Sequence, residues 1–232
     1  MVHILKREFI DSFKSIRSIL IILFIIFISY QAAAFVDNNP SFINELTGAG
    51  GEEGSAYTAA IALIVLVFGF LLVFATSHDL VYKEIELKTI RLLVTKVPRL
   101  QIMLGKLLGT MLFWIITISI SFSILSMFAN SWFPKDYFQT IIFLFYIISF
   151  VLLISTAITK TKLTMFLGII LGISLPIIGL TAIVSDKWYL APFKYILPYK
   201  YLDGSFGLMF VPLAIGIIYF LISVLLMQRK DL

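Results

Sequence analysis

The chain has 232 residues, of which 60% are hydrophobic and 13% are charged, with a formal net charge of +5. Soluble globular proteins carry about 25% charged residues, so this composition excludes an ordinary soluble domain and indicates that lipid surrounds much of the chain. Cysteine is absent, which excludes disulfides, thiol catalysis and cysteine metal sites.

Six uncharged apolar runs are each close to the ~20 residues that a helix needs to cross a hydrocarbon core of about 30 Å. They cover residues 18–36, 56–77, 107–129, 137–158, 163–184 and 206–227. We therefore predict an all-α membrane protein with six transmembrane helices and a single transmembrane domain over residues 1–232. The first run is longer than the core of a cleaved signal peptide, so we interpret it as a retained span.

Residues 1–17 precede the first span and mix apolar with charged side chains. Ile4, Leu5, Phe9 and Phe13 recur at helical spacing among six charged residues. This pattern predicts an amphipathic helix that lies at the inner membrane interface and bends into the first span.

Residues 78–100 form the most informative polar segment, between the second and third spans. Apolar residues from Leu80 to Val97 alternate with charged residues at roughly helical spacing, and Pro98 ends the run. Such a helix is too short and too charged to span the membrane. It could lie along the inner membrane surface, or it could dock a cytoplasmic partner, and the residues alone favour neither.

The third span carries small polar residues. Ser119, Ser123 and Ser126 step by four and three residues, so they share one helix face. Close helix packing is the favoured interpretation, and a polar lining of a substrate path is the alternative.

Two pairs of glycines have the spacing that lets helices approach closely. Gly105 and Gly109 form one pair, and Gly168 and Gly172 form the other. Both patterns predict tight helix contacts.

Residues 185–205 are rich in aromatic side chains, with Trp188, Tyr189 and Tyr199 among them. Because Tyr and Trp prefer the headgroup level, an interfacial aromatic belt is the favoured interpretation. The alternative is a half-inserted element, which would have to be buried against protein.

The positive charges are distributed unevenly between the two sides of the membrane. Of the 18 Lys and Arg residues, 14 fall in the two terminal segments and the connections around 78–106 and 159–162, and 4 fall in the other connections. The positive-inside rule therefore predicts a multi-pass protein of the cell membrane with both termini in the cytoplasm. Anionic lipid explains the basic residues, so we do not expect nucleic acid as a partner.

The sequence offers no catalytic machinery. The spans contain no Asp, Glu, Lys, Arg or His, which disfavours a proton-driven transporter. His3 and His78 are the only histidines, and Gly105-Lys106 lacks the other residues of a nucleotide-binding loop. We predict no catalytic, cofactor or metal site in this chain.

Three groups of residues carry a further pattern: Glu84, Glu86, Thr89, Leu92-Leu93, Pro98, Arg99 and Gly105-Lys106 after the second span, Lys6-Arg7-Glu8-Phe9 at the start, and the basic and acidic ending from Met227 to Leu232. Together with the six spans, this pattern resembles the membrane subunits of ABC type-2 exporters. One departure is Lys88, where the family commonly has glycine before the threonine.

The resemblance implies that the segment after the second span is a coupling helix that docks on a separate cytoplasmic ABC ATPase. The docking residues it implies are Asp79, Lys83, Glu84, Glu86, Lys88, Thr89, Arg91, Leu92, Leu93, Pro98 and Arg99. It further implies a homodimer or heterodimer of permeases surrounded by membrane lipid, with ATP and Mg bound by the partner.

We therefore predict a permease subunit of an ATP-dependent ABC exporter, with a hydrophobic or amphipathic peptide or drug as its substrate. A possible substrate path includes Ser119, Ser123 and Ser126. The alternative is a non-transporting membrane scaffold or sensor that recruits a cytoplasmic partner through the same amphipathic helix.

Overall fold

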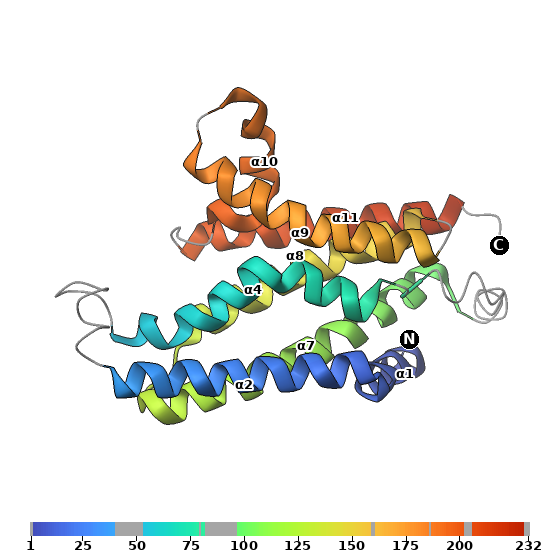
Figure 1. Ribbon diagram of the computed structural model, residues 1–232. Helices are drawn as coiled ribbons and strands as arrows, with labels where there is room; N and C mark the ends of the chain where they lie inside the picture. The colour runs from blue at the N-terminus through green and yellow to red at the C-terminus, as the bar shows by residue number, and fades with distance from the viewer. Residues whose placement is uncertain are drawn as a thin grey trace.

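The computed structural model describes residues 2–39, 53–78, 80–81, 97–158, 161–185, 187–201 and 206–229. All regular structure in these ranges is helical. Helices long and apolar enough to cross a membrane occur six times in the described part of the chain, which confirms the predicted spans (Figure 1). The long helices are α2 (Ile16–Asn38), α4 (Glu53–Ser77), α7 (Arg99–Ala129), α8 (Pro134–Ala157), α9 (Thr161–Val184) and α11 (Phe210–Arg229).

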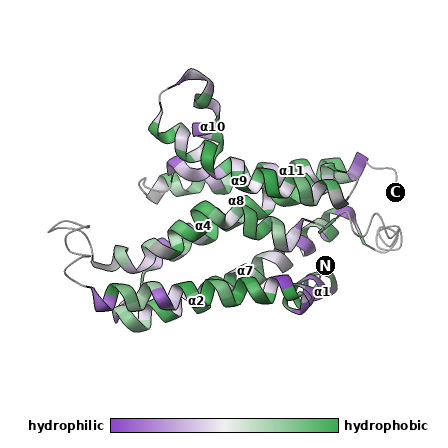
Figure 2. Cartoon of the chain, viewed as in Figure 1, coloured by the Kyte–Doolittle hydropathy of each residue, from purple (hydrophilic) through white to green (hydrophobic). Residues whose placement is uncertain are grey.

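The long helices run side by side, and both chain termini lie at the same end of the bundle (Figure 1). We call this the terminal end, and the other the distal end. Figure 2 shows hydrophobic residues along most of each long helix and hydrophilic residues on α1 (Val2–Lys14) at the terminal end. The charged helix α1 is separated from α2 by Ser15, whose backbone is extended, with φ −72° and ψ 125°. The predicted bend before the first span is present, and the position of α1 in a membrane interface stays a prediction.

The boundaries of α7 differ from the predicted third span. The helix begins at Arg99, directly after Pro98, rather than at residue 107. The predicted coupling segment 78–100 therefore overlaps α7 at its last two residues. The helix ends at Ala129 and is followed by Asn130, which adopts the left-handed conformation with φ 49° that commonly terminates helices.

Aromatic side chains fill the centre of the bundle between α4 and α8. The ring of Phe70 on α4 makes edge-to-face contacts with Phe143, Tyr146 and Phe150 on α8, with centroids 6.0 to 6.4 Å apart. Such contacts add about 0.5 to 1.5 kcal/mol each beyond the area they bury. They join α4 to α8 at the centre of the bundle.

Gly168 and Gly172 let α9 approach α4 closely, as predicted. A Cβ placed on Gly172 would lie 2.9 Å from the Cα of Leu71, and one on Gly168 would lie 2.8 Å from the ring of Phe74. A side chain at either position would push the two helices apart.

The aromatic segment after α9 forms the short helices η1 (Trp188–Leu190), α10 (Ala191–Ile196) and η2 (Pro198–Tyr201). Figure 1 shows α10 standing out from the side of the bundle, next to α9. The Tyr199 hydroxyl donates a hydrogen bond to the carbonyl of Leu66, in the middle of the span Ala56–Ser77, at 3.1 Å. Tyr199 therefore binds the backbone of another span, and the position of this aromatic segment in a membrane interface stays a prediction.

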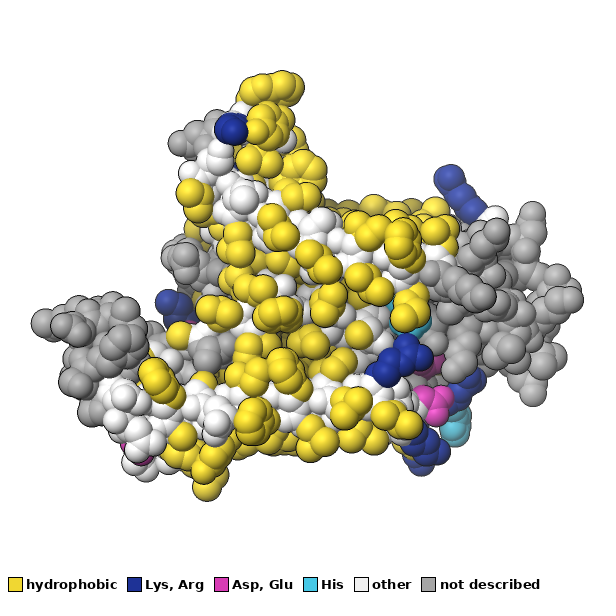
Figure 3. All heavy atoms as spheres, viewed as in Figure 1, with side chains coloured by type: hydrophobic (Ala, Val, Ile, Leu, Met, Phe, Trp, Pro, Cys, Tyr) yellow, Lys and Arg dark blue, Asp and Glu magenta, His cyan; other side chains and the backbone are white. Residues whose placement is uncertain are grey.

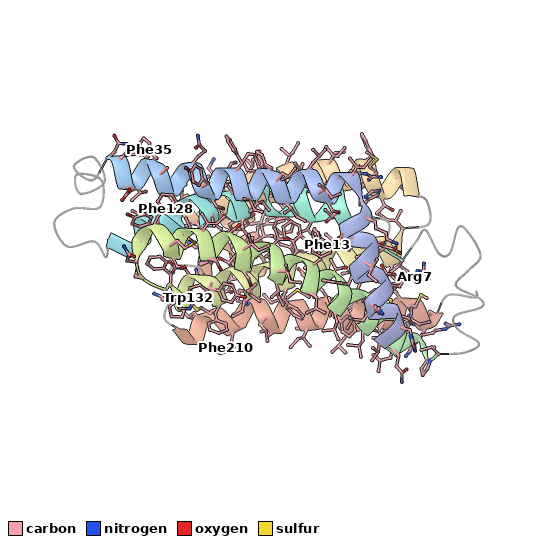
Figure 4. All side chains as sticks on the ribbon, turned by 90° about the horizontal axis from the view of Figure 1, so that it is seen from below. Arg7, Phe13, Phe35, Phe128, Trp132 and Phe210 are labelled. Carbon is pink, nitrogen blue, oxygen red and sulfur yellow. The ribbon has the colours of Figure 1, made fainter. Side chains whose placement is uncertain are left out.

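The chain continues through η3 (Phe206–Met209) into α11. α11 packs mainly against α8, and its first residues lie at the distal end of the bundle (Figure 4). Phe210 is labelled there together with Phe35, Phe128 and Trp132, whereas Arg7 and Phe13 mark α1 at the terminal end.

Candidate functional site

The first turns of α7 lie directly against α1. A Cβ on Gly105 would lie 2.9 Å from the side chain of Ile4, and one on Gly109 would lie 3.0 Å from the carbonyl oxygen of Leu5. The glycine pair therefore allows backbone contact between the two helices, as its spacing predicts. The rings of Phe13 on α1 and Phe113 on α7 extend the contact, with centroids 5.0 Å apart.

A buried ion pair sits between the two glycines. The Nζ of Lys106 lies 2.7 Å from Oε1 of Glu8, and their side chains are only 1% and 13% exposed. Glu8 fits because Gly109 lacks a side chain: a Cβ there would lie 2.8 Å from the Cβ of Glu8. Separating α1 from α7 would therefore leave a buried charge without its partner, which is costly.

The N-terminal end of α7 is also joined to the C-terminal end of α11. Nη1 of Arg99 donates to the carbonyl oxygens of Met227 at 2.7 Å and Gln228 at 2.5 Å. The last carbonyls of a helix have no partner within the helix and carry partial negative charge. The Arg99 guanidinium supplies both the missing hydrogen-bond donors and a positive charge.

The chain leaving α4 is held by α8. The backbone N–H of Val81 donates to Oγ of Ser155 on α8 at 3.2 Å, and both residues are fully buried. His78 directly follows α4 and is also buried. Its Nδ1 lies 3.1 Å from the carbonyl oxygen of Phe74.

These contacts bracket residues 82–96 on both sides. The chain enters this segment at Val81, fixed to α8, and leaves it at Arg99, fixed to α11 and followed by the contact with α1. α8 and α11 also pack extensively on each other. Figure 3 shows Lys, Arg, Asp, Glu and His side chains gathered at this end of the bundle.

Two of the predicted docking residues fall within the described part of the chain. Pro98 directly precedes α7, and Arg99 makes the contact with α11. The other predicted docking residues lie outside the described ranges: Asp79, Lys83, Glu84, Glu86, Lys88, Thr89, Arg91, Leu92 and Leu93.

The predicted path serines lie on α7 and bind mainly their own helix. Ser119 donates to the carbonyl of Ile115 at 2.7 Å, and Ser123 donates to that of Ser119 at 2.7 Å. The Ser126 hydroxyl bonds the carbonyl of Ser123, and Ser119 also lies 2.9 Å from the Tyr137 hydroxyl on α8. Ser119 therefore contributes to helix packing, whereas Ser123 is exposed on the surface of the single chain.

Comparison with known protein families identifies the chain. Residues 2–188 match the family described as ABC-2 family transporter protein. The chain belongs to the ABC-2 transporter family. No curated protein matches it.

Family membership confirms the resemblance to ABC type-2 permeases found in the sequence. An ABC-2 permease is the membrane subunit of an ABC transporter and implies an ABC ATPase as its partner. In this ABC-2 chain, the matched range includes α1, the segment bracketed by Val81 and Arg99, and α7.

Sequence reasoning did not find four of the residues that make these contacts, Glu8, Ser155, Met227 and Gln228. Glu8 could have been found, because Lys106 lies between closely packed glycines and needs a buried counter-charge. Ser155 and the carbonyls of Met227 and Gln228 carry no comparable signal. Serines occur in many apolar runs and every residue has a backbone carbonyl, so the sequence does not indicate which of them binds a distant partner.

Proposed function

We propose that this chain is the permease of an ATP-driven ABC exporter and that residues 79–97 dock on the ATPase. The observation that supports this most is the bracketing of that segment by Val81 and Arg99, each fixed to a different helix. A segment that only covered the membrane surface would need no such attachment at both of its ends.

The contacts suggest how movement passes into the membrane. When the ATPases close on nucleotide, the docked segment shifts. The shift reaches α8 through Ser155 and α11 through Arg99, and these two helices pack on one another. It reaches α1 through the Glu8 and Lys106 pair. Packed helices move as rigid units between discrete arrangements. The pair of α8 and α11 and the pair of α1 and α7 therefore repack between inward-facing and outward-facing states.

The proposed assembly contains two permeases, identical or related, and two ATPases that bind ATP and Mg. Both termini face the cytoplasm, which puts residues 79–97 on the ATPase side, in agreement with the distribution of Lys and Arg. α2 exposes a long apolar face that includes Leu20, Leu23 and Phe27, which lipid or the second permease would cover.

The proposed substrate is a hydrophobic or amphipathic peptide or drug. The six apolar runs contain no Asp, Glu, Lys, Arg or His, which fits an apolar cargo better than an ion. Ser123, exposed on α7, offers a polar contact to a path shared with a second permease, and Ser119 and Ser126 lie beside it on the same helix.

The deciding experiment compares two charge reversals in the full transporter. Glu84→Lys changes the proposed docking segment, and Glu52→Lys makes the same change in a connection predicted on the opposite side. Co-purification in mild detergent measures the bound ATPase, and ATP hydrolysis in lipid vesicles measures coupling.

We expect Glu84→Lys to lose most of the bound ATPase and of the substrate-stimulated hydrolysis, and Glu52→Lys to keep both. Equal retention in the two variants would overturn the docking assignment. ATPase binding without transport of any amphipathic peptide or drug would instead support the scaffold or sensor.

A further inference from the structure

A cavity of about 400 Å³ opens between α4, α7 and α8 at the distal end of the bundle. Its volume lies within the range of about 300 to 1,000 Å³ that small-molecule sites occupy. The residues that line it include Thr58, Ala62, Lys135, Asp136, Gln139 and Phe143.

The lining changes from polar to apolar along the helices. Lys135 and Asp136 belong to the first turn of α8, and Thr58 lies near the start of the span Ala56–Ser77. Phe143 on α8 and Val65 on α4 lie seven residues further along, which is about 10 Å deeper. The cavity therefore has a charged rim at the level of the helix ends and an apolar floor within the bundle.

The rim presents two opposite charges, Lys135 and Asp136, that do not form an ion pair with each other. The buried hydroxyl of Thr58 donates to Oδ2 of Asp136 at 2.5 Å and fixes the carboxylate at the mouth. Lys135 is exposed, and no ion pair joins Lys135 to Asp136 among the contacts of the described residues. The rim thus offers a cation and an anion on adjacent residues.

We infer that this cavity binds a zwitterionic phospholipid, with its headgroup at the rim and one acyl chain on the floor. The ammonium of a phosphoethanolamine headgroup pairs with Asp136, and its phosphate pairs with Lys135. The acyl chain follows the apolar wall from Ala62 to Phe143. The site is separate from the ATPase docking segment and does not depend on the proposed export function.

The test uses a single-chain zwitterionic probe, lauroyl lysophosphatidylethanolamine, with purified protein in maltoside detergent. Native mass spectrometry counts the probe molecules bound to each chain. Ala62→Phe fills the cavity, and Leu63→Phe is its matched control, because Leu63 is the next residue of α4, is 59% exposed and does not line the cavity. We expect Ala62→Phe to bind the probe about tenfold more weakly than Leu63→Phe, a loss of about 1.4 kcal/mol, because the added ring occupies volume that the acyl chain needs.

A second comparison tests the headgroup. Lys135→Gln removes one charge of the rim, and monolauroylglycerol is a probe with the same chain and an uncharged head. We expect Lys135→Gln to weaken binding of the zwitterionic probe about tenfold, the loss of one charge-assisted contact, and to leave binding of the neutral probe unchanged.

Two results would overturn the inference: equal binding of the zwitterionic probe by Ala62→Phe and Leu63→Phe, or an equal effect of Lys135→Gln on both probes. If Ala62→Phe does not fold, Ala59→Phe fills the same cavity from the preceding turn and replaces it.

Discussion

Nη1 of Arg99, in the first turn of α7, lies 2.7 Å from the carbonyl oxygen of Met227, in the last turn of α11. The two residues are far apart in the sequence, and the contact joins the start of the third span to the end of the sixth. Because only Pro98 separates residues 79–97 from Arg99, this contact connects the proposed ATPase docking segment to the last helix.

Replacing Arg99 should weaken coupling more than it weakens the fold. In Arg99→Gln, the carbonyls of Met227 and Gln228 lose a charged donor, at a cost of about 1 to 2 kcal/mol. We expect ATP hydrolysis to lose its response to substrate while the variant still purifies as a folded protein. Arg99→Lys keeps one donor and should recover part of the response. A full response in Arg99→Gln would show that the contact does not transmit movement.

Breaking the pair between Glu8 and Lys106 should destabilise the protein strongly. Lys106→Gln leaves the buried carboxylate of Glu8 without its partner, which costs about 3 kcal/mol or more. Glu8→Gln combined with Lys106→Met removes both charges and should recover most of the stability. The measurement is the free energy of unfolding in mixed detergent.

The exposed pair of Arg7 and Asp11 on α1 provides the control. Its atoms lie 3.7 Å apart, and both side chains are more than half exposed. Arg7→Gln should therefore leave the free energy of unfolding almost unchanged. A loss as large as that of Lys106→Gln would mean that charge on α1, rather than burial of the pair, determines the effect.

A side chain at Gly109 should separate α1 from α7. Gly109→Leu would place atoms where the Leu5 carbonyl and the Glu8 side chain lie, and overpacking of this kind costs about 1 to 3 kcal/mol. Gly207→Leu is the control, because a Cβ there meets no atom within 4 Å. Thermal unfolding should show a lower midpoint for the first variant alone, and equal midpoints would contradict the tight contact.

Removing the hydroxyl of Tyr199 should loosen the segment between α9 and α11. Tyr199→Phe keeps the ring and removes the bond to the Leu66 carbonyl, at a cost of about 1 kcal/mol. Tyr189→Phe is the matched control, since Tyr189 is 50% exposed. Proteolysis of the segment should become faster in Tyr199→Phe only, and equal rates would mean that the ring alone holds it.

The six spans could be predicted because each depends on a local property, a run of apolar residues long enough to cross the membrane. The close contacts at Gly109 and Gly172 could be predicted for a similar reason, since small residues at this spacing leave room for a neighbour. The glycine spacing does not identify the neighbouring helix. Only the folded chain shows that α1 packs at Gly109 and α4 packs at Gly172.

The details of the candidate site could not be predicted from local patterns. Lys106 looked like the last residue of a polar connection, whereas the helix continues through it because Glu8 compensates its charge. The aromatic residues after α9 suggested a position at the interface, but the carbonyl that Tyr199 binds lies in another span. Both differences arise from contacts between distant parts of the sequence.

The orientation of the bundle rests on the distribution of Lys and Arg and can be measured directly. The chain has no cysteine, so single cysteines can be introduced without other changes. Asn39 follows α2 at the distal end, and Gln228 lies at the last turn of α11, at the terminal end. Because 14 of the 18 basic residues lie in segments on the side of the termini, we expect Asn39→Cys to face outward.

A membrane-impermeant maleimide applied to intact cells should therefore label Asn39→Cys and spare Gln228→Cys. Permeabilised cells are the control, and in them both variants should react. The reverse pattern in intact cells would place residues 79–97 outside the cell, where no ATPase can reach them. It would overturn the proposed coupling while leaving the six spans and the contacts between α1, α7, α8 and α11 intact.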